Sequence, residues 1–235
     1  MMQTPPQNAR GREAHSSEGL PLFIFLVVLG STLALGSSIL AECGLQRGVR
    51  NLANVSFTTA VLSIASFAYM RLRGQSWTHW GLRRVKWSVM LGGLGLGLAS
   101  MPLIALVALS IRMLFSPEAA HPQAELLRMD GLPLPGQALM TLLVVMLAPL
   151  AEELLFRGVI FAAITHPHRP MHAVWVSAAL FGLLHGALSV MVATFLLGLI
   201  MGLLRLRTGS IWPAWALHVG NNGLAWCSLL TGWAL

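Results

Sequence analysis

Long apolar runs separated by short polar connections make up most of the chain. An apolar run of about 20 residues spans the hydrocarbon core as a helix. On this measure the pattern predicts seven membrane-spanning helices, within a range of six to eight because two short runs meet at Gly186 and a long one contains Pro102. Their approximate ranges are 20–40, 53–70, 87–113, 138–164, 172–186, 187–204 and 211–234.

The expected fold is therefore an all-α, polytopic membrane helix bundle. Residues 1–19 are polar and are expected to form a disordered tail, while residues 20–235 form a single multi-spanning domain. The first apolar run has no convincing small-residue cleavage site, so we expect it to be retained as a signal anchor.

Composition supports a membrane protein. The 235 residues are 56% hydrophobic and only 10% charged, whereas a soluble domain carries about 25% charged residues. The net charge of +7 comes from basic residues at the ends of the apolar runs. Such placement predicts contact with the headgroups of a lipid bilayer and no nucleic-acid partner. The two cysteines, Cys43 and Cys227, offer neither a disulfide framework nor a metal-binding pattern.

The basic residues also predict the orientation. If the N-terminus is inside, the inner connections hold ten lysines and arginines and the outer ones hold four. Cytoplasmic connections carry the excess of positive charge. We therefore expect a multi-pass protein of the inner (plasma) membrane with a cytoplasmic N-terminus.

Three charged residues interrupt the fourth apolar run: Glu152, Glu153 and Arg157. Each unpaired charge at the centre of a membrane helix costs about 2.5–3.5 kcal/mol on insertion scales, so pairing or chemistry is expected. Glu153 and Arg157 are four residues apart in the order that favours an ion pair. Glu152 lies about 100° further round the helix, which leaves it free to act as a general base.

Two later runs each carry a histidine in a short polar motif. Phe181 and His185 are four residues apart, as are His218 and Asn222, so each pair shares a helical face. A histidine can help to activate a water molecule. Imidazole and amide N–H groups can donate hydrogen bonds to the oxyanion that develops on a scissile carbonyl.

The order Glu-Glu-x-x-x-Arg, Phe-x-x-x-His and His-x-x-x-Asn, spread over residues 148–223, resembles the CAAX prenyl endopeptidase and bacteriocin-processing family of intramembrane proteases. The resemblance implies a membrane-embedded endopeptidase of the glutamic type, which cleaves peptides or proteins near their C-termini, including lipid-modified ones. It also implies that Glu152 and His185 activate the water, that His218 and Asn222 stabilise the oxyanion, and that Glu153 and Arg157 organise the site. No cofactor is required by this interpretation.

Three alternatives remain open. In the first, the same protease is metal-dependent and Glu152, His185 and His218 hold a zinc ion, since a carboxylate with two histidines is a usual zinc set. In the second, the chain is a proton-coupled transporter or channel. In the third, it is a non-catalytic membrane protein for immunity or scaffolding. Other protease classes are disfavoured, because the sequence has no HExxH or GxSxG motif and only one aspartate, Asp130.

Overall fold

The computed structural model describes residues 7–115, 125 and 127–231, and the regular elements within these residues are all helices. The π-helical segments are labelled η. In chain order the elements are α1 (Gln7–Glu42), α2 (Arg47–Leu72), α3 (Trp87–Phe115), α5 (Leu134–Leu142), η1 (Leu143–Leu147), α6 (Ala148–Glu153), η2 (Leu154–Ile160), α7 (Phe161–Ile164), α8 (Pro170–Leu183), α9 (Leu188–Thr208) and α10 (Trp212–Thr231).

The helices confirm the expected membrane bundle. Within the described part of the chain, five helical stretches are long and apolar enough to cross a bilayer: Gly19–Glu42, Arg47–Leu72, Trp87–Phe115, Leu134–Ile164 and Leu188–Thr208. Each coincides with a predicted span. The other two predicted spans are also helices, but α8 has only 14 residues and is about 21 Å long. Helix α10 has 20 residues, and residues 232–234 of its predicted span lie outside the described residues.

Two boundaries follow from local chemistry. The chain turns between α8 and α9 at Gly186, whose φ of +81° is readily adopted only by glycine, so the predicted division at this residue is confirmed. At the N-terminus the structure differs from the expected disordered tail, because α1 begins at Gln7. No proline interrupts residues 7–19, and the helix continues through them. The first six residues of the predicted tail lie outside the described residues.

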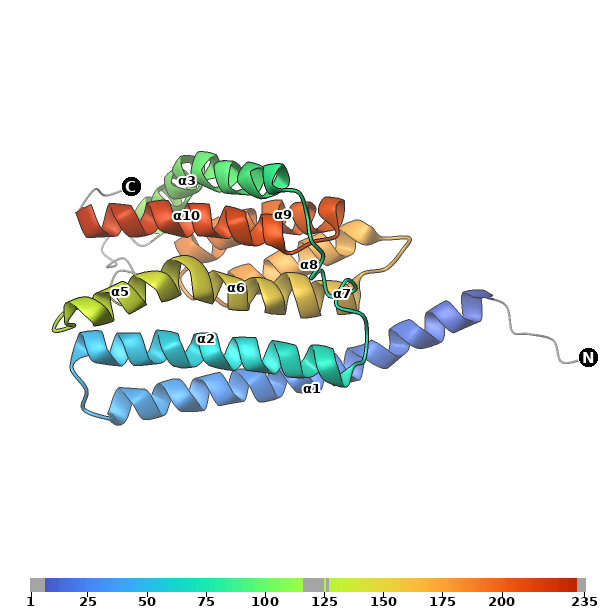
Figure 1. Ribbon diagram of the computed structural model, residues 1–235, viewed down its shortest axis with the longest axis horizontal. Helices are drawn as coiled ribbons and strands as arrows, with labels where there is room; N and C mark the ends of the chain where they lie inside the picture. The colour runs from blue at the N-terminus through green and yellow to red at the C-terminus, as the bar shows by residue number, and fades with distance from the viewer. Residues whose placement is uncertain (1–6, 116–124, 126, 232–235) are drawn as a thin grey trace, which may run out of the picture.

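Elements α5 through α7 form one continuous helical stretch at the centre of the bundle (Figure 1). Helix α2 packs against α6 and η2, and α10 packs against η1 and α6. The segment from Glu153 to Phe161 is buried at every position. A helix that is enclosed on all sides needs apolar residues around its whole circumference, and the two leucines, two phenylalanines, valine and isoleucine of this stretch supply them.

Glycines allow the outer helices to pack closely. A Cβ atom at Gly97 would lie 2.1 Å from the Leu217 carbonyl oxygen, and one at Gly93 would lie 2.3 Å from that of Pro213. These glycines therefore bring α3 against the backbone of α10. Gly198 and Gly202 pack in the same way against α8, since their Cβ atoms would meet Ala178 and Val174 at 3.1 Å. Close helix packing explains both glycine sets.

Candidate active site

The two glutamates of α6 occupy different environments. The Glu153 side chain has no exposed surface, whereas 24% of the Glu152 side chain is exposed. Adjacent residues of a helix point about 100° apart, so one carboxylate enters the core while its neighbour reaches the edge of it. Of the two, only Glu152 is accessible to water and substrate.

Glu153 forms the predicted ion pair with Arg157. The Arg157 Nη1 atom donates to Glu153 Oε1 at 2.9 Å, and both side chains are fully buried. Arg157 Nη2 donates to the Gly198 carbonyl oxygen at 3.2 Å. The guanidinium carbon also lies 4.6 Å from the centroid of the Phe181 ring, within the range of a cation–π contact. The pair is therefore anchored to α8 and α9 as well as to its own helix.

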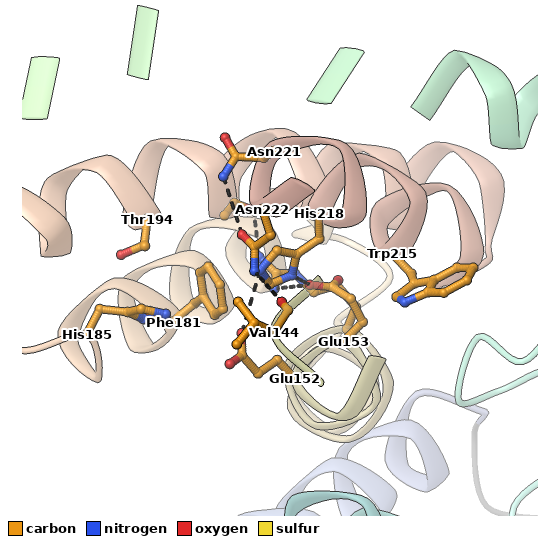
Figure 2. Close-up of polar contacts among 12 residues, drawn as sticks. Val144, Glu152, Glu153, Phe181, His185, Thr194, Trp215, His218, Asn221 and Asn222 are labelled. Carbon is orange, nitrogen blue, oxygen red and sulfur yellow. Dashed lines mark hydrogen bonds and ion pairs between the residues drawn. The ribbon is translucent and has the colours of Figure 1, made fainter. Parts of the chain in front are cut away.

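His218 contacts both glutamates (Figure 2). Its Nδ1 atom lies 3.2 Å from Glu153 Oε1, and its Nε2 atom lies 3.7 Å from Glu152 Oε2. An ionised carboxylate can only accept hydrogen bonds, so Nδ1 carries a proton and donates to Glu153. This contact fixes the ring so that Nε2 faces Glu152, in the same way that a carboxylate bonded to one ring nitrogen orients a metal-binding histidine.

His185 lies just beyond the last turn of α8, and its ring is held by Phe181. The His185 Nδ1 atom is 2.6 Å from the Phe181 carbonyl oxygen. A carbonyl only accepts, so Nδ1 carries a proton, and a neutral ring of this tautomer keeps a lone pair on Nε2. The Phe181 ring centroid lies 4.6 Å from that of His185 and 5.6 Å from that of His218. Figure 2 shows the ring between the two imidazoles.

The described hydrogen bonds and ion pairs join Glu152 to His218 but not to His185. The structure therefore brings Glu152, Glu153, Arg157 and His218 into one connected group, and the hydrogen bonds of Asn222 go to Val144 and Asn221 instead. His185 is attached to that group through the Phe181 ring.

Asn222 reaches the central helix. Its Nδ2 atom donates to the Val144 carbonyl oxygen at 3.2 Å, one turn along α10 from His218. The neighbouring Asn221 donates to Asn222 Oδ1 at the longer distance of 3.5 Å. An amide nitrogen carries two hydrogens, so Asn222 keeps a second donor while it holds Val144.

The Val144 carbonyl is free because of the local helix register. The backbone N–H of Ala148, which would bond to Val144 in an α-helix, bonds to the Leu143 carbonyl oxygen instead. In that π register the next donor for Val144 would be residue 149, which is a proline and has no N–H. Asn222 supplies the missing hydrogen bond. Pro149 is the one sign of this irregularity in the sequence, and it does not identify the π form.

The residues proposed as a zinc set do not form a metal-binding group here. No cluster of three or more histidine, cysteine, aspartate or glutamate side chains within the described residues is arranged to hold a metal ion. Glu152, His185 and His218 are thus not gathered around one point.

Comparison with known proteins supports the family resemblance. Residues 134–224 match the family described as type II CAAX prenyl endopeptidase Rce1-like. No curated protein and no solved structure matches the chain significantly. The matched stretch runs from the start of α5 into α10 and contains all six candidate site residues, while α1 to α3 lie outside it. The resemblance expected from the three motifs is thereby confirmed over this stretch of the chain.

Proposed function

We propose that this chain, an integral membrane protein with an Rce1-like type II CAAX prenyl endopeptidase domain at residues 134–224, is an intramembrane endopeptidase of the glutamic type. Its substrate would be a peptide or protein cleaved near its C-terminus, including a lipid-modified one. The N-terminus would be cytoplasmic, in the plasma membrane. Glu152 lies nearer to the Ile164 end of its helical stretch than to the Leu134 end, so the site would lie toward the cytoplasmic side in this orientation.

In the proposed reaction Glu152 is the general base. Its carboxylate takes a proton from a water molecule, and the water oxygen attacks the scissile carbonyl carbon. When the tetrahedral intermediate collapses, the C–N bond breaks and the proton held by Glu152 passes to the leaving amine. A carboxylate that acts first as a base and then as an acid needs access to water and substrate, and the exposed edge of Glu152 meets that need.

The histidines and Asn222 have separate roles in this proposal. His185 assists water activation, because its Nδ1–H donates to Phe181 and its Nε2 keeps the lone pair that can accept a proton. His218 and Asn222 donate to the oxyanion; His218 does so in the state in which both of its ring nitrogens carry protons. Glu153 and Arg157 hold His218 in place. Removing one such oxyanion donor typically lowers kcat about 10²–10³-fold.

One observation carries the proposal. A partly exposed carboxylate, Glu152, lies 3.7 Å from the Nε2 atom of His218, whose opposite nitrogen is held by the buried Glu153. A helix inside a membrane bundle has no structural need for a second carboxylate beside the buried Glu153–Arg157 pair, and intramembrane ionisable groups are expensive. The arrangement suits a reactive Glu152 that faces His218, whose ring is oriented by the buried Glu153–Arg157 ion pair.

The test uses Glu152→Gln in the purified full-length chain with an internally quenched farnesylated CAAX peptide. The substitution keeps the shape of the side chain and removes the base, so cleavage should fall at least about 10²-fold, as for other general bases. Glu42→Gln is the matched control, because Glu42 is exposed at the end of α1. Equal turnover by the wild type and Glu152→Gln, or no cleavage by the wild type, would reject the proposal.

No resident metal takes part in the proposed reaction. The zinc-dependent form differs in one measurable respect, because activity would then follow the zinc content of the purified protein. Under our proposal turnover persists after dialysis against a chelator, in protein whose elemental analysis gives less than one zinc ion per chain.

A further inference from the structure

Arg205 is a buried cation that lies outside all three motifs. It sits in the last turn of α9 and only 8% of its surface is exposed. Among the described residues, no carboxylate lies within ion-pair distance of its guanidinium. Burying a charge is costly unless hydrogen bonds compensate for it, so its contacts indicate what it does.

Arg205 bonds to two backbone carbonyls from other parts of the chain. Its Nε atom donates to the Arg157 carbonyl oxygen and its Nη2 atom donates to the His79 carbonyl oxygen, both at 2.9 Å. The guanidinium carbon lies 5.4 Å from the centroid of the Phe161 ring. Arg205 therefore ties α9 both to η2 and to the connection between α2 and α3.

The connection between α2 and α3 is built to admit this side chain. Gly81 has a φ of +83°, and a Cβ atom there would lie 2.6 Å from Arg205 Nε. The same residue accepts a hydrogen bond from the Ile211 N–H at 3.0 Å, just after α9 ends. A side chain at position 81 would displace the guanidinium, so the glycine keeps space for it.

The Arg157 carbonyl, like that of Val144, does not receive the hydrogen bond that an α-helix would give it. In an α-helix it would accept the N–H of Phe161, but that N–H bonds to the carbonyls of Phe156 and Gly158 instead. Arg205 supplies a donor in its place. The short α6 segment, which carries the two glutamates, thus lies between two π-helical segments. In each π segment, one carbonyl lacks its α-helical donor and accepts a hydrogen bond from a side chain of another helix. That side chain is Asn222 for η1 and Arg205 for η2.

The register of η2 matters because it sets the direction of Arg157. A π-helical segment accommodates one extra residue relative to an α-helix, and one residue corresponds to about 100° of rotation. If the Arg157 carbonyl lost its donor, the Phe161 N–H could return to it and η2 could relax toward the α register. Arg157 would then turn relative to Phe161 and Arg205, and its ion pair with Glu153 would shift. His218, which shares Glu153 Oε1 with Arg157, would lose its fixed orientation.

We propose that Arg205 is a positioning residue for the active site, which acts by holding the Arg157 carbonyl and thereby the π register of η2. Its hydrogen bonds go to backbone carbonyls and to none of the six candidate site side chains. The proposal rests on the proposed function, because its consequence for turnover requires that Glu152 and His218 carry out the reaction.

The first test compares steady-state kinetics of the full-length chain on the farnesylated CAAX peptide. Arg205→Met removes all donors and keeps the apolar stem, and Arg205→Lys keeps the charge with one compact donor group. We expect kcat to fall about 10–100-fold in Arg205→Met, since a displacement of about 1 Å can cost that much, with KM unchanged within about twofold. The kcat of Arg205→Lys should lie between those of Arg205→Met and the wild type. The matched control is Arg207→Met, because Arg207 is exposed on the same helix, and it should leave kcat unchanged.

The second test measures hydrogen exchange of the backbone amides of residues 154–164 by mass spectrometry and needs no substrate. We expect faster exchange in Arg205→Met than in the wild type and in Arg207→Met, with the amides of α1 unaffected. If the wild type does not cleave the peptide, the proposed function fails, and the exchange measurement alone decides whether Arg205 holds η2.

The proposal is overturned if Arg205→Met keeps wild-type kcat, if Arg207→Met loses as much, or if exchange in residues 154–164 is unchanged. Should Arg205→Met fail to fold, Arg205→Lys decides the matter. If kcat and exchange in that variant equal those of the wild type, the two hydrogen bonds from the Arg205 guanidinium are unnecessary and the proposal is overturned. Reduced kcat together with faster exchange would uphold it.

Discussion

The buried ion pair between Glu153 and Arg157 allows a quantitative prediction. Arg157→Met removes the hydrogen bond to Glu153 Oε1 and the one to the Gly198 carbonyl. It leaves a carboxylate without exposed surface whose Oε2 atom already has no hydrogen-bond partner within the described residues. Breaking a buried pair from one side typically costs about 3–5 kcal/mol of unfolding free energy, because the remaining charge is uncompensated. We expect a loss in that range.

Removing both charges of the pair should lower the free energy of unfolding less than removing one of them. Apolar replacement of a whole buried pair is often neutral or stabilising, so Glu153→Leu/Arg157→Met should be more stable than Arg157→Met alone. The double variant should nevertheless be inactive, because the Nδ1–H of His218 then has no carboxylate to orient it. Going from Arg157→Met to the double variant should therefore raise stability without restoring activity.

The assay is equilibrium unfolding of the purified chain in mixed micelles, followed by tryptophan fluorescence, together with peptide cleavage. Arg128→Met is the control, because Arg128 forms an ion pair with Glu125 at 3.1 Å in which both side chains are about half exposed. Such surface pairs contribute about 0.2–1 kcal/mol. Two results would refute the reasoning. In the first, the double variant loses as much unfolding free energy as the single variants Glu153→Leu and Arg157→Met lose together. In the second, Arg157→Met loses no more unfolding free energy than Arg128→Met.

Two further predictions concern α10. Gly97→Ala places a Cβ atom against a backbone oxygen of α10, whereas Gly92→Ala meets nothing within 4 Å. In equilibrium unfolding, the first should lower the free energy of unfolding by an amount typical of overpacking, about 1–3 kcal/mol, and the second should not. Asn222→Asp removes the amide donor and should lower kcat about 10²–10³-fold, as expected for a lost oxyanion donor, while Asn221→Asp should have a much smaller effect; equal effects in a cleavage assay would contradict the choice of Asn222.

Local spacing accounted for the parts of the site that lie on one helix. Glu153 and Arg157 are four residues apart, and helical geometry alone brings their side chains together. The contact between Phe181 and His185 also follows from a separation of four residues, although α8 ends at Leu183 and His185 lies beyond it. Side chains at this spacing meet over a single turn, so no tertiary information is needed to pair them.

The π register of the central helix was not predictable in the same way. Pro149 signals a missing backbone N–H, but a proline alone is compatible with a kink, a water-filled gap or a π segment. The register depends on donors that come from other helices: Asn222 lies 78 residues from Val144 along the chain, and Arg205 lies 48 residues from Arg157. Periodicity within one helix carries no information about such partners.

From the sequence alone came the number and approximate limits of the apolar helices, the polar residues that interrupt them, and the division at Gly186, because bilayer thickness, helical repeat and glycine conformation are local constraints. Only the tertiary structure decided that His218 lies between the two glutamates, that His185 reaches them through the Phe181 ring, and that Arg205 holds the backbone at Arg157. These contacts depend on how separate helices pack and rotate against one another. That packing is fixed by side chains far apart in the sequence.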